Sequence, residues 1–151
     1  MEEMLFLPQK AYMILGNLRS QLLYPRVDAK VPDEEIAKVL ENVNLGTLLE
    51  RVGGLDAEVD FAKVLSLGEQ QRLAVARVIL NKPRFTILDE ATSALDAQNE
   101  NQLYALLKGF DTTLISVSHH ASILQFHENV LELDGKGGWK VVPTKDYIFE
   151  E

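Results

Sequence analysis

Two adjacent carboxylates, Asp89 and Glu90, follow the apolar run FTIL at residues 85–88. A strand that ends in this way places its acidic side chains at the carboxyl edge of a parallel sheet, where α/β proteins bind their ligands. Hydrolysis of a nucleoside triphosphate needs one carboxylate to hold Mg²⁺ and a second group to orient the attacking water. Asp89 suits the metal and Glu90 the water, because consecutive residues of a strand point to opposite faces. Taken alone, the pair fits two solvated charges at the end of a strand at least as well.

A second candidate is the segment LSLGEQQR at residues 65–72, in which Ser66 precedes Glu69 by three positions. This spacing is that of a capping box, where each side chain accepts a hydrogen bond from the other residue's backbone N–H. A helix N-terminus also binds anions, because its free N–H groups and its dipole favour negative charge. Gly68 would let a phosphate approach the backbone closely. The spacing alone leaves both interpretations open.

The elements that must position these residues follow from the hydrophobic pattern. We expect strands at residues 3–7, 85–89, 112–118, 129–133 and 139–142, and helices at residues 33–42, 45–51, 66–80, 97–110 and 121–126. Asp33 and Asp96 are expected N-caps, and DGKGG at residues 134–138 is expected to form a hairpin turn. Because helices alternate with apolar strands, the pattern predicts an α/β fold whose mostly parallel sheet is covered on both faces. A helical subdomain at about residues 10–82 would precede an α/β core at about residues 83–151.

The composition limits the kind of partner. The 151 residues suffice for one domain with its own core. A formal net charge of -8 argues against nucleic-acid binding, because phosphate backbones favour surfaces rich in Lys and Arg. The absence of Cys excludes disulfides and Cys-based metal or nucleophile chemistry. The apolar runs are shorter than the ~20 residues that cross a bilayer, and no basic-then-apolar leader is visible.

The sequence contains, in this order, the five short segments FLPQ, LSLGEQQR, FTILDE, SALD and SVSH, and this is the order of five motifs in the ATPases of ABC transporters. LSLGEQQR resembles their signature segment, with Leu67 and Glu69 where Gly and Gln are usual. FTILDE resembles their Walker B strand and catalytic glutamate, and SALD, ending at Asp96, resembles the D-loop. SVSH, ending at His119, resembles the switch-histidine loop, and FLPQ, ending at Gln9, resembles the Q-loop. The chain is therefore identified as a member of this family, with a P-loop NTPase fold.

The resemblance implies roles in binding and hydrolysing ATP with Mg²⁺. Gln9 would contact Mg²⁺ or the attacking water, and Asp89 would hold the metal. Glu90 would activate the water, and His119 would hold the γ-phosphate. A surface histidine that follows a strand is the alternative for His119. His127 is expected to be solvated and receives no role.

The resemblance also implies partners. The signature segment, Ser66 with Leu67, Gly68 and Glu69, would contact the γ-phosphate of ATP held by a second ATP-binding domain, in a homo- or heterodimer. Asp96 would cross the interface between the two domains. Gln9 would connect the site to the transmembrane domain of the same transporter. The chain would then lie at the cytoplasmic face of a membrane as a peripheral domain of that transporter.

A narrower resemblance is carried by FLPQKAYMILGNLRSQLLYP together with Gly-Glu in the signature. It is similar to the branch that contains peroxisomal fatty-acyl transporters and bacterial relatives with a membrane domain fused ahead of the ATPase domain. Two positions depart from the family's usual residues: Phe61 stands where Trp is common, and His120 stands where Arg is common. Neither departure removes a catalytic group.

One expected motif is missing from these residues. A Walker A loop needs G-x-x-x-x-G-K-[ST], yet no Lys of this sequence is followed by Ser or Thr. The Gly-rich candidate around Lys136 is better explained as a hairpin turn. In the family this loop precedes the Q-loop, so we expect the C-terminal part of an ATP-binding domain, inactive alone. The strand that leads into the loop would be absent from the sheet, and the free strand edges would favour self-association, strand exchange or a rearranged sheet.

Three functional hypotheses remain open at this point. The chain could be part of an ATPase that powers a membrane transporter. It could be a naturally truncated interaction module that pairs with a complete ABC ATPase and does not hydrolyse ATP. A soluble ABC ATPase without transmembrane partners is the third hypothesis.

Overall fold

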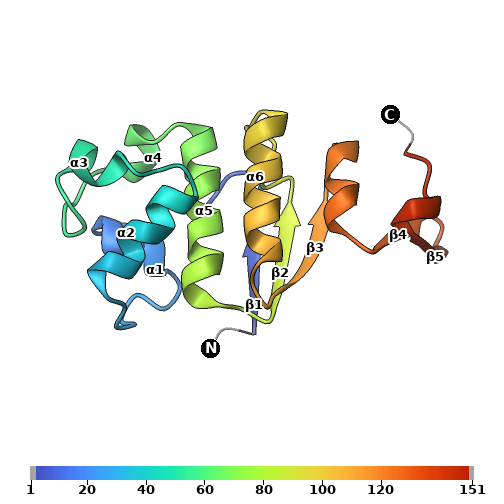
Figure 1. The fold of residues 1–151 in the computed structure, drawn as a ribbon, viewed down its shortest axis with the longest axis horizontal. Coiled ribbons are helices and arrows are strands. Elements are labelled where there is room, and N and C mark those ends of the chain that lie inside the picture. The colour runs from blue at the N-terminus through green and yellow to red at the C-terminus, as the bar shows by residue number, and fades with distance from the viewer. Residues whose placement is uncertain (1–2, 150–151) are drawn as a thin grey trace.

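Three parallel strands form the main sheet of the protein. The computed structural model describes residues 3–149. In their order across the sheet, the strands are β1 (Met4–Leu7), β2 (Phe85–Asp89) and β3 (Thr113–Val117). Leu7 lies opposite Leu88, and Asp89 lies opposite Val117. The strands therefore end at the same edge of the sheet, as the sequence predicted (Figure 1).

The helix α5 joins a helical region to this sheet. The α-helices of the described residues are α1 (Leu18–Leu23), α2 (Asp33–Asn42), α3 (Leu48–Val52), α4 (Phe61–Val64), α5 (Leu67–Asn81) and α6 (Ala97–Lys108). On one side α5 packs against α1 and α2, and on the other it packs against α6 (Figure 1). Leu73, Val75 and Ala76 are completely buried, so α5 is enclosed by both parts of the fold. Within residues 3–149, no helix is both long and apolar enough to cross a membrane.

The helical region departs from the expectation at three points. Asp33 is the first residue of α2 and not its N-cap, which is Pro32, and the Asp33 carboxylate accepts a hydrogen bond from Arg19 at 2.6 Å. The expected helix at residues 45–51 begins only at Leu48, and Gly53 ends it with a left-handed backbone. The short α4 was not predicted, since one turn of helix is too short to show a periodic pattern.

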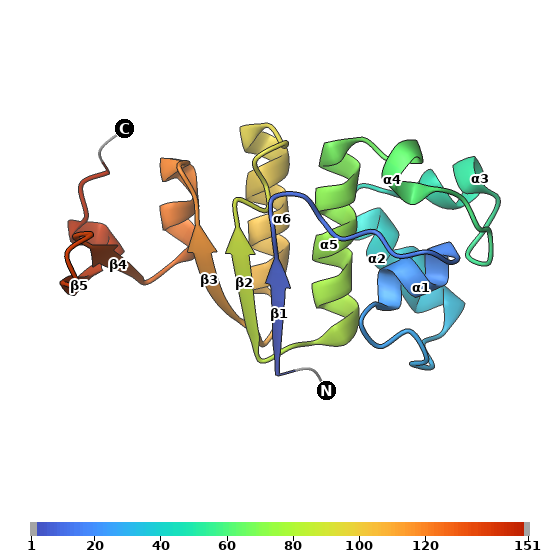
Figure 2. The same cartoon turned by 180° about the vertical axis from the view of Figure 1, so that it is seen from behind.

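Both connections between the parallel strands run over the same face of the sheet. β1 leads to β2 through the helical region and α5, and β2 leads to β3 through α6. The strands follow one another in a single direction across the sheet, and parallel crossovers are almost always right-handed, so both crossovers lie on one side. Figure 1 shows α6 in front of the strands, and Figure 2 shows the strands in front of α6.

The opposite face of the sheet is exposed, so the expectation of two covered faces is wrong for this chain. Leu88 on the covered face is 1% exposed, whereas Ile115 and Val117 on the other face are 47% and 56% exposed. Met4 and Phe6 continue this exposed face on β1. An apolar pattern indicates that a face is suited to burial, but a cover requires a connection that runs back across the sheet.

The C-terminal strands form a separate antiparallel hairpin, β4 (Asn129–Leu133) and β5 (Trp139–Pro143), between the 3-10 helices η1 (Ala121–Phe126) and η2 (Thr144–Asp146). Asp134 closes its turn by accepting hydrogen bonds from the backbone N–H groups of Lys136 and Gly138. These hydrogen bonds, that of Lys136 first, hold the pKa of Asp134 below its ordinary value. The hairpin turn at DGKGG is thereby confirmed.

A cavity separates the hairpin from the parallel sheet. β4 pairs with β5 and not with β3 in the described sheets. Between β3 and β4 lies an open cavity of about 560 Å³, lined by side chains of both strands and of η1. The facing edges of β3 and β4 are therefore available for hydrogen bonding to a further strand.

Candidate functional site

The carboxyl ends of the three parallel strands bring together three predicted site residues. Gln9 follows β1 by two positions, Glu90 follows β2 directly, and His119 follows β3 by two positions. Because β2 is the central strand, Glu90 lies between the other two segments. The sheet thus places an amide, a carboxylate and an imidazole at one edge, from segments that are far apart in the sequence.

Glu90 leaves its strand through a left-handed turn. Its φ of 54° is uncommon for a residue other than glycine, and such residues gather at functional sites. Its N–H donates to the carbonyl of Val117 at 2.9 Å, which fixes the turn against β3. The direction of the Glu90 side chain therefore comes from this turn and not from the strand alternation expected from the sequence.

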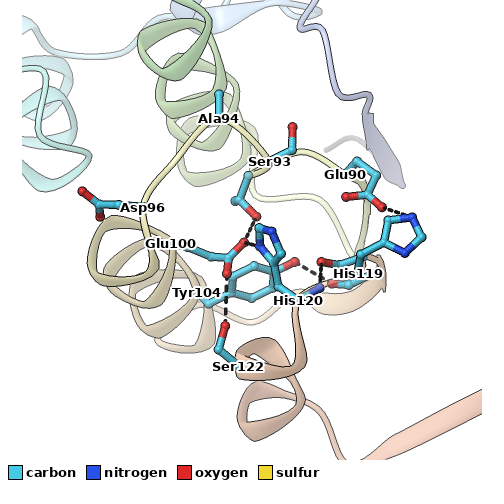
Figure 3. A network of polar contacts seen from close by, with 12 residues as sticks. Glu90, Ser93, Ala94, Asp96, Glu100, Tyr104, His119, His120 and Ser122 are labelled. Carbon is cyan, nitrogen blue, oxygen red and sulfur yellow. Dashed lines mark hydrogen bonds and ion pairs between the residues drawn. The ribbon is translucent and has the colours of Figure 1, made fainter. Parts of the chain in front are cut away.

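The carboxylate of Glu90 faces the imidazole of His119. Glu90 Oε1 lies 3.3 Å from His119 Nε2 (Figure 3). The Glu90 side chain is 21% exposed and the His119 side chain is 94% exposed. The pair therefore lies at the rim of the sheet, where a ligand can reach both groups.

Asp89 and Gln9 offer the oxygen atoms that a magnesium ion takes in proteins. Asp89, the last residue of β2, lies beside Val117 on the exposed face of the sheet. Mg²⁺ is usually held by one or two carboxylates, with waters and substrate phosphates as its other ligands. Residues 3–149 contain no group of three or more His, Cys, Asp or Glu side chains that could hold a metal. This donor set fits an ion that is bound together with a phosphate-bearing substrate.

Ser66 caps α5 in the capping box that the sequence indicated. Its Oγ accepts from the N–H of Glu69 at 3.2 Å, and the Glu69 carboxylate accepts from the N–H of Ser66 at 3.0 Å. Glu69 also pairs with Arg51 at 2.7 Å. Partial burial acts to raise the pKa of Glu69, but the hydrogen bonds from Ser66 and Arg51 lower it below the ordinary value. The structural interpretation of the spacing is confirmed, while Ser66 and Leu67 stay exposed at the tip of the helix.

The start of α5 lies against the segment that ends in Asp96. A Cβ placed on Gly68 would lie 3.4 Å from Leu95 Cδ2 and 3.6 Å from the carbonyl of Ala94. Asp96 caps α6 as predicted, because its carboxylate accepts from the N–H of Asn99 at 2.8 Å. In Figure 3 the Asp96 side chain points away from Glu90. Within one chain, Asp96 therefore takes no part in the interaction between Glu90 and His119.

Comparison with known proteins decides the family of this domain. A profile described as ABC transporter matches residues 4–93, which is more than half of the 151 residues. This chain belongs to the ABC transporter family. An uncharacterized ABC transporter ATP-binding protein of Synechocystis is 50% identical over 144 residues, which cover 95% of this chain and 22% of that protein. The ATP-binding cassette sub-family D member 3 of Mus musculus is 42% identical over 143 residues, which cover 91% of this chain and 22% of that protein.

A solved structure gives the same result for the fold. A bacterial Atm1-family ABC exporter with ATP bound matches with a TM-score of 0.73 and 26% identity, over 87% of this chain and 24% of that one. The chain therefore has the α/β fold of an ABC-type P-loop ATP-binding domain. The matches to sub-family D and to a cyanobacterial protein confirm the narrower resemblance. The chain spans about a fifth of the length of these curated relatives.

Gln71 connects three of the ABC motifs and was not singled out from the sequence. Its Nε2 donates to the carbonyl of Gln9 at 2.7 Å and to Ser93 Oγ at 3.2 Å. Its Oε1 accepts from the N–H of Ala94 at 2.9 Å. The side chain is buried, so it links the Q-loop, the signature helix and the D-loop from inside the fold. A glutamine in a mixed helical pattern carries no signal that separates this position from a solvated one.

Arg77 anchors the segment that follows the Q-loop. Its guanidinium donates to the carbonyls of Gln21 at 2.6 Å and of Tyr12 at 2.7 Å, and it lies over the ring of Tyr24 at 5.2 Å. Burial lowers the pKa of Arg77 to about 10. A signal for this residue exists in the sequence, because a single cation interrupts the apolar run LAVARVIL.

The histidine at position 127 is not solvated, so that expectation is wrong. His127 Nε2 lies 2.9 Å from Ser116 Oγ, and its Nδ1 lies 2.9 Å from the carbonyl of Ile123. Tyr104 donates to the same Ser116 hydroxyl at 2.9 Å, and burial raises the pKa of Tyr104 to about 12. The His127 ring is therefore partly buried and hydrogen-bonded to β3 and η1, which local sequence does not indicate.

Proposed function

We propose that this chain is the C-terminal part of an ATP-hydrolysing domain that powers an ABC membrane transporter of the exporter type. The observation that carries the proposal is the meeting of Gln9, Glu90 and His119 at one edge of the sheet, with Glu90 and His119 3.3 Å apart. The family membership and the likeness to an ATP-bound exporter support it.

Each side chain has a defined task in this function. Glu90 accepts a hydrogen bond from the attacking water and takes its proton as the oxygen approaches the γ-phosphorus of ATP. His119 donates a hydrogen bond to a γ-phosphate oxygen, where negative charge must be held during transfer. Asp89 and Gln9 would hold Mg²⁺. When bound, the ion supplies positive charge against the β- and γ-phosphate oxygens.

The phosphates must be held by a Walker A loop that is absent from these 151 residues. A strand that precedes β1 in sequence and lies beyond β3 would connect to β1 by crossing back over β3 and β2. A right-handed crossover in that direction lies on the opposite side from α6, over the exposed face of Ile115 and Val117. The cavity between β3 and β4 offers the place for such a strand. One missing strand–loop–helix unit would thus fill the cavity, cover the exposed face and bring the loop to the site.

Two kinds of partner follow from this function. The exposed tip of α5, with Ser66 and Leu67, would face the ATP of a second ATP-binding domain, and Asp96 would lie at the interface. Gln9 and the segment after it would meet the transmembrane domain of the same transporter. The domain would lie at the cytoplasmic face of the membrane. The transported substrate would be selected by that transmembrane domain.

The test is made on the protein completed with its Walker A segment, with and without Glu90→Gln. The substitution should lower ATP turnover by at least about a hundredfold, as expected for loss of a general base, and leave ATP affinity nearly unchanged. Glu34→Gln, the same change at an exposed residue of α2, is the matched control and should have no effect.

Calorimetry on the 151-residue chain completes this test. Because the chain lacks the loop that grips the phosphates, it should show no Mg-ATP binding at physiological concentration. Tight, Mg-dependent binding by this chain, or full turnover in the Glu90→Gln protein, contradicts the proposal. A completed protein that binds ATP and never hydrolyses it also contradicts the proposal.

A further inference from the structure

A buried carboxylate lies directly behind the Glu90–His119 pair. Glu100 is the fourth residue of α6 and is 1% exposed. Its Oε2 accepts from Thr92 Oγ1 at 2.6 Å and from His120 Nδ1 at 2.9 Å, and its Oε1 accepts from Ser122 Oγ at 3.2 Å. Figure 3 shows His120 and Ser122 converging on this side chain. One carboxylate therefore joins three chain segments.

The segments that Glu100 joins are those that carry the two proposed catalytic groups. Thr92 lies two residues after Glu90, and His120 directly follows His119. The His119 ring is 94% exposed, and within residues 3–149 Glu90 is its ion-pair partner. The direction of the ring thus depends on how the backbone at residues 118–122 is held. That backbone is tied to α6 through His120 and Ser122.

The cost of burying this carboxylate indicates a specific role. A buried charge is unfavourable unless it is paired and hydrogen-bonded, and an apolar residue at the same place often gives equal or greater stability. Glu100 is satisfied by two hydroxyl groups and one imidazole, each from a different position of the two strand-end loops. In some proteins, buried ionic groups of this kind are retained for the geometry that they specify.

We propose that Glu100 is a positioning residue that keeps His119 in register with Glu90. This inference rests on the proposed function, since it concerns the same hydrolytic pair. Glu100 holds the loop after β2 through Thr92 and the loop after β3 through His120, so the two loops keep a fixed separation. Its removal leaves both proposed catalytic groups present but no longer aligned.

The charge of His120 makes this arrangement sensitive to pH. The hydrogen bond to Glu100 and the attraction of the same carboxylate raise the pKa of His120, burial opposes them, and Glu90 adds a further increase. The other titratable groups near it are Tyr104 on α6 and the adjacent His119, and His127 after η1 lines the same cavity.

The direction of this pH dependence follows from the raised pKa of His120. The stabilisation from the His120–Glu100 pair is fully present below the ordinary imidazole pKa of about 6.5. It is lost as the pH rises through the raised pKa of His120. Above that pH the imidazole is neutral, so the buried Glu100 carboxylate loses its cation. The alignment of His119 should therefore weaken on the alkaline side.

The first test is a titration of the 151-residue chain by NMR. In the wild-type chain the pKa of the His120 ring should lie above that of an ordinary imidazole. In Glu100→Gln the pKa of this ring should return toward the ordinary value. The signals of His119 should shift in the same variant. The matched control Glu35→Gln, on the exposed face of α2, should change neither histidine. A His120 ring that titrates identically in wild type and Glu100→Gln overturns the inference.

The second test measures turnover in the completed protein. Glu100→Gln should lower kcat by about tenfold to a hundredfold with little change in KM, since small misplacements cost that much. Because Glu100→Gln removes a buried charge, the half-exposed His120→Gln provides a milder second variant and should shift the alkaline limb of the pH profile. His120→Arg keeps a cation beside Glu100 at every pH. Its kcat should be higher than that of His120→Gln and close to that of the wild type, and it should not fall on the alkaline side of the pH profile.

The outcomes separate this inference from the function on which it rests. Full turnover in Glu90→Gln overturns the proposed function, whatever Glu100 does. A protein that requires Glu90 but keeps its kcat and pH profile in Glu100→Gln and His120→Gln overturns only the positioning role.

Discussion

The two faces of the parallel sheet differ in cover although their residues are of the same kinds. On the covered face Leu7 and Leu88 are enclosed beneath the helices, whereas on the other face Phe6, Ile115 and Val117 are about half exposed. Apolar residues dominate both faces. The difference therefore comes from connectivity, because the strands advance in one direction and right-handed crossovers then stay on one side. Composition shows what a face is suited to, and strand order decides whether this chain can cover it.

Truncation of one residue on each face tests this comparison most strongly. Leu88→Ala should lower the free energy of unfolding by about 3 kcal/mol, because it removes a buried side chain and leaves a cavity. Ile115→Ala, its matched control on the exposed face, should cost less than about 1 kcal/mol in the isolated chain. Urea unfolding measures both. Equal losses at the two positions would mean that the second face is covered in solution, through self-association or a rearranged sheet.

On the covered side of the sheet, Gln71 holds the segments that carry Gln9 and Ala94. A substitution of Gln71 tests how much these contacts stabilise the fold. Gln71→Met keeps the shape of the side chain but leaves the carbonyl of Gln9 and the N–H of Ala94 without their partner. The free energy of unfolding should fall by about 2 kcal/mol, because two partly buried backbone groups lose their hydrogen-bond partner. Gln102→Met, on the exposed surface of α6, should stay within about 0.5 kcal/mol of wild type. A loss at Gln71 no larger than at Gln102 would show that the Gln71 hydrogen bonds contribute nothing to the fold.

The smallest effect is expected at the exposed tip of α5. Ser66→Ala should cost about 1 kcal/mol of stability, because one N–H of the first turn loses its side-chain acceptor. Thr47 occupies the N-cap of α3 without a side-chain hydrogen bond, so Thr47→Ala is the matched control and should change stability little. Thermal unfolding compares the two variants. A loss of stability at Thr47 that matches the loss at Ser66 would remove the evidence for the cap.

The sequence predicted well those features that depend on local chemistry or on strand ends. The three parallel strands, the capped helices α5 and α6 and the C-terminal hairpin were all expected. The common edge of Gln9, Glu90 and His119 was also predictable, because parallel strands share one carboxyl end. The assignment of the family rested on the same motifs.

The rest depended on contacts between distant segments. Glu100 and Gln71 are polar residues in amphipathic helices, and only the tertiary fold shows that they are buried. The expected cap at Asp33 is wrong: α2 begins one position earlier, with Pro32 as its N-cap, and the Asp33 carboxylate pairs with Arg19, fourteen positions before it. Two covered faces were expected from apolar strands alone, and the order of strands in the sheet was the information that was missing.

The hydrogen bonds that Arg77 donates to backbone carbonyls have a mechanical consequence. The irregular segment after Gln9 is fastened to α5 at two levels, by Gln71 near the first turns of the helix and by Arg77 about two turns later. A helix of 15 residues is a stiff rod about 22 Å long. A force that displaces this segment must either break these hydrogen bonds or move α5 with it as a rigid body. The end of α5 that would then swing is its N-terminal end, which begins at Ser66.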